Sequence, residues 1–111
     1  KNNKALMLGV TFKENCPDIR NTRAIDIYNE LNSFGLKVDV FDPWASSEEV
    51  RKEYDIEILD DYPKTNNYGA MILAVAHDEF KNIDISKHKS AGTIIFDVKG
   101  MLPTDIISAR L

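Results

Sequence analysis

The chain has 111 residues, with 14 Lys plus Arg against 18 Asp plus Glu and a formal net charge of −4. This length fits one compact domain and excludes two, and an apolar share of 43% with 29% charged residues excludes a disordered or fibrous chain. The acidic balance, with no run of Lys or Arg longer than two residues, argues against a general nucleic-acid or membrane-surface binder.

The amino-terminal residues point to a cytoplasmic fragment. Residues 1–4 lead directly into a short apolar segment that does not resemble a signal peptide, and no apolar run approaches the roughly 18 residues of a membrane span. The chain starts at Lys1 instead of Met, so we interpret it as part of a longer protein. The single cysteine, Cys16, excludes an internal disulfide framework and a cysteine-based metal cluster.

Strand-like and helix-like segments alternate along the chain. The predicted strands are residues 5–10, 37–42, a weaker 56–59, the almost wholly apolar 70–76, and 93–98. Helices are predicted between them, with short helical turns at residues 78–80 and 85–89 and a final helix at 104–111. This alternation is typical of a parallel sheet covered by helices. We therefore predict an α/β fold, a Rossmann-like three-layer sandwich with a mostly parallel sheet of about five strands, forming one domain over residues 1–111.

The clearest helix is predicted after the first strand. Apolar side chains recur there at helical spacing and define one face, which we expect to be core and not a partner groove: Ala24, Ile27, Tyr28, Leu31 and Phe34. Asn21 or Thr22 can cap its start, and Gly35 can adopt the left-handed conformation that ends it. A second helix, residues 46–53, has Ser46 or Ser47 as its cap.

The connection after the first strand is the first candidate binding element. Residues 9–22 exceed the two to six residues of an ordinary connector, contain the cations Lys13 and Arg20, and lead into a helix amino terminus that favours anions. Ligands of such sheets bind beyond the carboxyl ends of the strands, so we interpret this segment as a phosphate-facing loop. The alternative is purely structural, with Asp18 and Arg20 pairing to hold the loop's shape.

Two known types of nucleotide or signalling domain do not fit. The loop contains neither G-x-G-x-x-G nor G-x-x-x-x-G-K-[ST], which disfavours an independent NAD-binding or nucleoside-triphosphatase domain. A signalling receiver domain fits the length, the acidity and a lysine after the last strand, Lys99. Such a domain needs clustered carboxylates after its first strand to hold magnesium, whereas this strand leads to Gly9, Val10 and Thr11.

Several motifs together carry a family resemblance over essentially the whole chain. They are Gly9-x-x-Phe12-Lys13-x-Asn15-x-x-Asp18-x-Arg20-x-Thr22, Phe41-Asp42-Pro43, His77-Asp78-Glu79-Phe80 and Phe96-Asp97-Val98-Lys99-Gly100. This set resembles the carboxy-terminal, UDP-binding domain of the nucleotide-sugar 6-dehydrogenases, the UDP-glucose/GDP-mannose dehydrogenase family. The stretch Asn15-Cys16-Pro17-Asp18 resembles the UDP-N-acetylhexosamine enzymes of capsule and O-antigen synthesis more than the UDP-glucose enzymes.

The resemblance implies a three-part enzyme of which this chain is the third part. An amino-terminal domain would bind NAD, a helical middle would form the homo-oligomer, and this domain would close over the UDP-sugar. The C6 alcohol of the sugar would be oxidised in two hydride transfers to a uronic acid, through a thiol-linked intermediate. The catalytic cysteine belongs to a Gly-x-Cys-type motif outside this chain, so no catalytic residue is assigned here and the fragment alone is expected to be inactive.

The resemblance also implies binding roles for individual residues. Phe12, Lys13 and Lys99 match substrate-contacting positions, with Lys99 standing where many relatives have Arg. Arg20 matches an arginine that faces the dinucleotide cofactor, with Asp18 holding its guanidinium. Because Lys lacks the bidentate fork of Arg, Lys99 is expected to act as a point charge.

Other chemically suggestive residues are assigned structural roles. Cys16 has no evident base to activate it, and His77 and His88 have no third ligand at metal-like spacing, so neither a nucleophile nor a metal site is predicted. Asp42 is interpreted as the end of a strand at a turn, and His77 as a cap for the turn after strand 70–76, with a ligand-facing position also open. Trp44 is expected to be exposed and to mark an interface.

Two interpretations of function remain open at this point. In one, the chain is the UDP-sugar-binding module of an NAD-dependent oxidoreductase. In the other, it is a non-catalytic α/β regulatory or interaction domain whose loop binds another phosphate ligand. The residues do not specify which sugar is bound.

Overall fold

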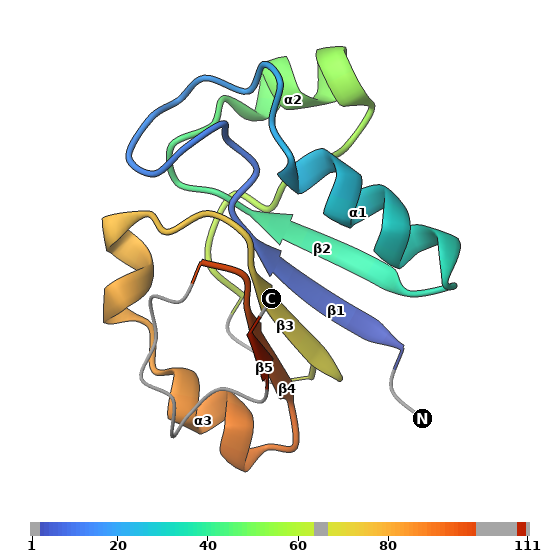
Figure 1. The fold of residues 1–111 in the computed structure, drawn as a ribbon, viewed down its shortest axis with the longest axis vertical. Coiled ribbons are helices and arrows are strands. Elements are labelled where there is room, and N and C mark those ends of the chain that lie inside the picture. Colours follow the sequence, from blue (N-terminus) through green and yellow to red (C-terminus); the bar gives the residue numbers. More distant parts are fainter. Residues whose placement is uncertain (1–2, 64–66, 100–108, 111) are drawn as a thin grey trace.

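The computed structural model describes residues 3–63, 67–99 and 109–110 (Figure 1). The elements follow in the order β1 (Lys4–Leu8), α1 (Ala24–Ser33), β2 (Lys37–Phe41), α2 (Ser47–Tyr54), β3 (Ala70–Leu73), the 3-10 helix η1 (Asp78–Asn82), α3 (Ile85–Ser90), β4 (Ile94–Asp97) and β5 (Ala109–Arg110).

The strands form one parallel sheet in the order β2-β1-β3-β4-β5. β1 lies between β2 and β3, and Met7 is in register with Val40 on one side and Ile72 on the other. Because all strands run the same way, their carboxyl ends meet at one edge of the sheet. The Rossmann-like architecture predicted from the alternation of segments is confirmed.

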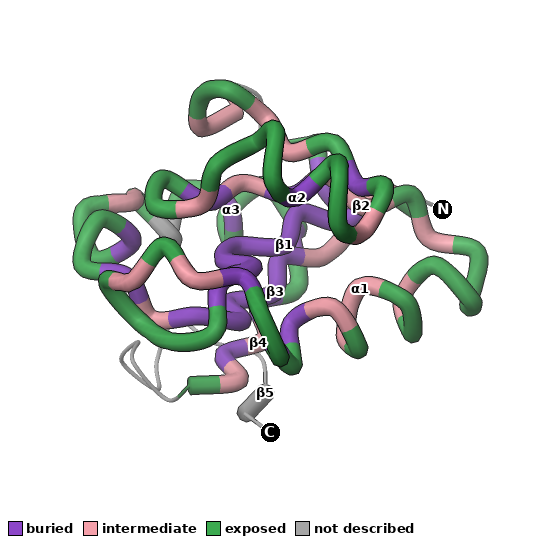
Figure 2. Tube along the Cα trace, turned by 90° about the horizontal axis from the view of Figure 1, so that it is seen from above, coloured by how far each residue is buried: buried purple, intermediate pink, exposed green. Residues whose placement is uncertain are grey.

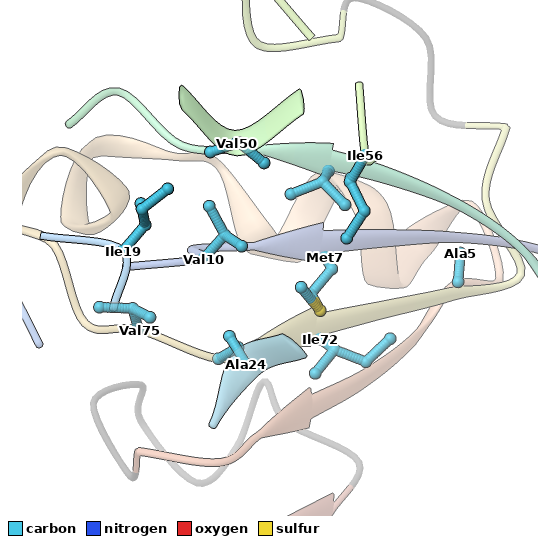
Figure 3. Close-up of a cluster of buried hydrophobic side chains, with 11 residues drawn as sticks. Ala5, Met7, Val10, Ile19, Ala24, Val50, Ile56, Ile72 and Val75 are labelled. Carbon is cyan, nitrogen blue, oxygen red and sulfur yellow. The ribbon is translucent and has the colours of Figure 1, made fainter. Parts of the chain in front are cut away.

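Side chains alternate between the two faces of the sheet and build two hydrophobic clusters. From β1, Ala5 and Met7 join the cluster on the side of α1, whereas Leu6 and Leu8 join the cluster that contains Phe80. Figure 3 shows the first cluster, to which the labelled residues Ala5, Met7, Val10, Ile19, Ala24, Val50, Ile56, Ile72 and Val75 belong. Figure 2 shows the buried segments gathered along β1 and β3, as expected of central strands.

The helix ends follow the capping residues expected from the sequence. Thr22 Oγ1 accepts a hydrogen bond from the Ala24 backbone N–H at 3.1 Å, and Gly35, at φ 84°, follows the end of α1. The Ser46 hydroxyl caps α2 by accepting a hydrogen bond from the Glu49 N–H at 3.3 Å. No helix in the described part of the chain is long and apolar enough to cross a membrane.

Two segments differ from the sequence prediction. Residues 56–59 do not form a strand; they contribute one isolated parallel bridge, Ile58 to Val40, at the outer edge of β2. Ala109–Arg110 is a strand paired with β4, not part of a helix, because the open edge of β4 offers backbone partners. The rest of the predicted helix at 104–111 lies outside the described residues. The expected number of strands is confirmed, although β5 takes the place of the segment at 56–59.

The apolar face of α1 is only partly core. Ala24 is buried, but Phe34 lies beyond the last helical residue and is 75% exposed, so assigning it to the core was wrong. Ile27 and Leu31 are half-buried and line a groove of about 570 Å³ between α1 and strands β3 and β4. The helical period correctly placed these side chains on one face, which packs against the first hydrophobic cluster but is only partly covered by the described elements.

Candidate functional site

The loop of residues 9–22 leaves β1 through a tight contact with the end of β3. Gly9 adopts φ 100°, and a Cβ atom at this position would lie 2.5 Å from the Cβ and 2.8 Å from the backbone nitrogen of Val75. Only glycine combines this conformation with such a close approach. The backbone of the loop therefore starts directly against the chain that follows β3.

Hydrogen bonds hold both the stem and the body of this loop. The Phe12 N–H donates to the Asp18 carbonyl at 2.7 Å, and the Thr22 hydroxyl donates to the Thr11 carbonyl at 2.9 Å. The Tyr54 hydroxyl donates to the Ile19 carbonyl at 2.5 Å, which joins the loop to the end of α2. The loop is thus a built structure, shaped before any ligand binds.

A buried hydrogen-bond network joins the loop to the turn after β3, and we call it the His77 latch: Thr11, Asn15, Asp42 and His77. His77 Nδ1 accepts the Asn15 backbone N–H at 2.9 Å, so Nδ1 carries no proton and the ring hydrogen is assigned to Nε2. Nε2 lies 3.0 Å from Asp42 Oδ2 and 3.1 Å from Thr11 Oγ1. The Thr11 hydroxyl donates its own proton to the Lys13 carbonyl at 3.0 Å, so Oγ1 acts as an acceptor toward Nε2. The single Nε2–H is therefore shared between Thr11 Oγ1 and the Asp42 carboxylate, and this tautomer accounts for the three contacts of the ring.

Asp42 is the acceptor at the base of the latch. Its side chain is fully buried, and its oxygens accept hydrogen bonds from the backbone N–H groups of Val10, Trp44 and Ala45 at 2.7, 2.7 and 3.0 Å. Burial pushes the pKa of Asp42 upward, but the hydrogen bonds from His77, Val10 and Trp44 outweigh it and hold the pKa below its ordinary value. These hydrogen bonds favour the ionised form of the carboxylate.

Aromatic rings fix the orientation of His77. Trp44 stacks on the imidazole with ring centroids 6.1 Å apart and an interplanar angle of 25°, and Phe80 packs at 5.4 Å. Trp44 is 37% exposed and its Nε1–H donates to Glu79 Oε1 at 2.8 Å. His77 is itself fully buried, which rules out the ligand-facing position left open by the sequence.

A small cavity of about 130 Å³ opens at the carboxyl edge of the sheet, between the loop, the start of α1 and the end of β4. It is lined by Thr11, Phe12, Asn21, Thr22, Arg23, Ala24, Ala74, Val75 and Lys99. Two cationic residues belong to this wall, Arg23 at the start of α1 and Lys99 after β4. The cavity has the size and the polarity of a pocket for a small anionic group.

The structure brings only some of the predicted binding residues to this cavity. Phe12, 55% exposed, and Lys99 line it. Lys13 is exposed beside Phe12 but is not among the residues of the cavity wall, and its backbone carbonyl accepts the hydrogen bond from Thr11. Arg20 lies further along the loop, also outside the wall. Figure 1 shows the loop, drawn in blue, at the same end of the sheet as the turn after β3.

Asp18 and Arg20 pair within the loop. Arg20 Nε and Nη2 each donate to one carboxylate oxygen of Asp18 at 3.0 Å, and the Arg20 backbone N–H adds a third bond to Oδ1. The side-chain hydrogen bonds from Arg20 lower the pKa of Asp18 to about 2. The ion pair between Asp18 and Arg20 that the sequence offered as a structural alternative is therefore present. The Arg20 side chain is 83% exposed, so its guanidinium still presents an edge to solvent.

Cys16 and the histidines show no arrangement for nucleophilic or metal chemistry. Cys16 is half-buried and unpaired within the loop. Among the described residues, no group of three or more His, Cys, Asp and Glu side chains could hold a metal ion. His88 is buried, its Nε2 lies 2.7 Å from the Tyr62 hydroxyl, and burial lowers its pKa.

Sequence reasoning missed the His77 latch. Asp42 was expected to end a strand at a turn, and its hydrogen bonds to the backbone of Trp44 and Ala45 confirm this. Its carboxylate also bonds to the Val10 N–H and to His77 Nε2, which the sequence analysis did not predict. The available signal was that Asp42 and His77 both follow strands predicted to be parallel, so their side chains meet at the same edge. Because Asp42 and His77 stand at the ends of the predicted strands 37–42 and 70–76, a hydrogen bond between them could have been predicted.

Fold and site together define a class: a Rossmann-like α/β domain with a small cavity at the carboxyl edge of its sheet, lined in part by Arg23 and Lys99. The sequence profile of the UDP-glucose/GDP-mannose dehydrogenase family, UDP binding domain, matches residues 6–104. The chain belongs to this family.

Curated relatives agree with this assignment. The chain is 46% identical over 109 residues to a UDP-N-acetyl-D-glucosamine 6-dehydrogenase of Salmonella typhi, covering 96% of this chain and 25% of the relative. It is 45% identical over 111 residues to the Pseudomonas aeruginosa protein of the same name, covering 97% and 26%. Protein CapL of Staphylococcus aureus is 38% identical over 102 residues, covering 89% and 24%. The chain thus spans about a quarter of the length of these relatives.

Solved structures share the fold. An NDP-N-acetyl-D-galactosaminuronic acid dehydrogenase of Methanosarcina mazei superimposes with a TM-score of 0.80 at 20% identity, over 99% of this chain and 24% of that one. The UDP-D-ManNAc dehydrogenase of Pyrococcus horikoshii gives 0.75 at 20% identity, over 98% and 25%. These structures show the shared fold, and the family assignment with the curated relatives favours the dehydrogenase interpretation over the regulatory or interaction domain.

Proposed function

We propose that residues 1–111 are the UDP-sugar-binding domain of a longer NAD-dependent UDP-sugar 6-dehydrogenase, which oxidises the C6 alcohol of the sugar to a uronic acid. The observation that carries this proposal is the cavity between Phe12, the start of α1 and Lys99, in a chain that belongs to the UDP-binding family. Arg23 and Lys99 both line the cavity, and two positive charges there complement a diphosphate.

The substrate that we propose is a UDP-N-acetylhexosamine. Two relatives at 46% and 45% identity carry the name UDP-N-acetyl-D-glucosamine 6-dehydrogenase. The Asn15-Cys16-Pro17-Asp18 sequence supports the same subfamily. The product, a sugar with a C6 carboxylate, suits the synthesis of acidic capsule or O-antigen polysaccharides.

Each binding residue has a distinct proposed role. Lys99 meets the diphosphate from inside the cavity, and Lys13 meets the phosphate or sugar from the loop above it. Phe12 places an apolar ring and backbone groups beside the ligand. Arg20 uses the guanidinium edge not occupied by Asp18 to reach across a cleft toward the dinucleotide.

The described residues do not themselves form a site for NAD. A Rossmann-type dinucleotide site needs a glycine-rich turn after its first strand, whereas the β1 turn has only Gly9. We therefore assign NAD to the amino-terminal domain of the longer enzyme, with Arg20 as the one contact from this chain. Hydride transfer and the catalytic cysteine belong to those other domains.

The partners and the compartment follow from the same proposal. The amino-terminal and central domains of the enzyme would close over the UDP-sugar, and the full-length protein would form a homo-oligomer in the cytoplasm. The relatives are about four times longer than this chain, which leaves room for both domains. The isolated chain offers one wall of the binding cleft and would bind weakly.

A titration of the chain with UDP, GDP and phosphate, followed by amide NMR, tests the proposal. We expect shifts at residues 10–22 and at Val98 and Lys99, with UDP bound more tightly than GDP or phosphate. Lys99→Ala should weaken UDP binding about tenfold, because a charge-assisted contact contributes roughly 1.5 kcal/mol.

Lys37→Ala is the matched control, since it removes the same charge at the amino end of β2, the opposite edge of the sheet. Equal affinity for UDP and phosphate, or equal effects of Lys99→Ala and Lys37→Ala, would contradict the proposed site.

A further inference from the structure

We propose that Asn15 and His77 are positioning residues: they hold the loop that carries Phe12 and Lys13 in the conformation that receives the UDP-sugar. This inference rests on the proposed function, and it assigns a binding role to two residues that do not line the cavity. It predicts that the contacts of Asn15 with His77 and Asp78 set the affinity for the nucleotide more than the stability of the fold.

Asn15 fastens the middle of the loop at two points. Its backbone N–H donates to His77 Nδ1 at 2.9 Å, and its side-chain Oδ1 accepts the Asp78 backbone N–H at 2.9 Å. Both bonds cross from the loop to the turn after β3. Asn15 adopts φ 55°, a left-handed conformation that Asn tolerates better than most residues and that turns its N–H toward the imidazole.

His77 is a rigid anchor for this contact. Nε2 is held by Asp42, whose other hydrogen bonds come from the backbone at the ends of β1 and β2. Trp44 and Phe80 pack against the ring. A ring flip would carry both nitrogens away from their partners in a fully buried site, so the imidazole presents Nδ1 to Asn15 in one fixed direction.

The geometry links the Asn15 end of the latch to binding and not to the core. Asn15, Phe12 and Lys13 are exposed, and none of them belongs to either hydrophobic cluster. Releasing Asn15 removes little buried surface, but it lets Phe12 and Lys13 sample conformations that cannot bind. The apparent dissociation constant rises in inverse proportion to the competent fraction, so a loop that is competent about 10% of the time binds about tenfold more weakly.

Asn15→Gly is the primary test, because glycine keeps the left-handed backbone and the N–H but removes the bond to Asp78. We expect the UDP dissociation constant to rise about tenfold, and the amide of residue 15 to exchange faster with solvent. Asp55→Gly is the matched control: Asp55 also has a positive φ, 58°, but lies at the end of α2, outside the loop and the cavity. It should leave UDP binding unchanged.

A pair of substitutions at His77 separates the two ring nitrogens. The amide oxygen of Asn reaches the level of Nδ1, so His77→Asn can still accept the Asn15 N–H. The longer side chain in His77→Gln reaches the level of Nε2 and loses that acceptor. If the Asn15 contact sets affinity, His77→Asn should bind UDP more tightly than His77→Gln at equal thermal stability.

The outcomes distinguish the latch from the function on which it rests. Failure of the unmodified chain to bind UDP would overturn the proposed function. If the unmodified chain binds UDP and Asn15→Gly binds it equally well, or His77→Gln equals His77→Asn, the positioning role is wrong. In Asn15→Gly, fluorescence of Trp44, the single tryptophan, reports whether the stacked His77 imidazole stays in place.

Discussion

Gly9→Ala should be among the most destabilising single-methyl additions in this chain, and the structure allows its cost to be worked out. An added Cβ would lie 2.5 Å from Val75 Cβ and 2.8 Å from the Val75 backbone nitrogen, so the backbone itself must move. The left-handed φ of 100° costs a non-glycine residue about 1–2 kcal/mol. Forcing an extra methyl group into a packed site adds roughly 1–3 kcal/mol. We expect a total loss of about 3 kcal/mol.

Gly35→Ala is the internal reference for the conformational part of this cost. Gly35 has φ 84° but no atom within 4 Å of the added Cβ, so this variant should lose about 1 kcal/mol. Urea unfolding measures both: with a slope of about 1.5 kcal/mol per M, a loss of 3 kcal/mol lowers the midpoint by about 2 M. If both variants lose the same stability, the close approach of Gly9 to Val75 does not constrain the fold.

Two further predictions concern titration. Asp18 should titrate near pH 2 by carboxyl NMR, because Arg20 hydrogen-bonds its ionised form, and Arg20→Ala should return its pKa toward 3.8; an Asp18 pKa near 3.8 in the unmodified chain would refute the pairing. Burial lowers the pKa of His88 in the folded state below 6.5, so the unfolded state takes up the proton first. The contribution of His88 to the free energy of unfolding should therefore be fully present above pH 6.5 and decrease as the pH drops toward the folded pKa. Urea unfolding at several pH values measures this decrease, and His88→Phe should remove it.

The fold was predictable because strongly apolar segments define its central strands. Residues 70–76 could only be a strand buried on both faces, and the parallel alternation then placed all ligand-facing loops at one edge. Weak segments were not predictable: residues 56–59 have the composition of a strand, yet only Ile58 reaches a partner, Val40. Phe34 fits the helical spacing of the apolar residues, but α1 ends at Ser33. Helical spacing does not predict which way a side chain points once the helix has ended.

The site was predictable residue by residue but not as a network. Phe12 and Lys99 follow β1 and β4, so their convergence follows from the parallel sheet. Arg20 and Asp18 are two positions apart, so their pairing is local. The bonds of His77 to Asp42 and Asn15 instead cross 35 and 62 positions, and they depend on how the ends of three strands are aligned. No local pattern encodes that alignment.

The long reach of the His77 latch has a consequence for folding kinetics. Its hydrogen bonds form only after β1, β2 and β3 have docked with their ends in register, because Thr11, Asp42 and His77 each follow a different strand. We expect contacts that require three docked strands to form after the folding transition state and to show φ-values near zero. The latch should therefore contribute to kinetic stability: weakening it should raise the unfolding rate and leave the folding rate almost unchanged.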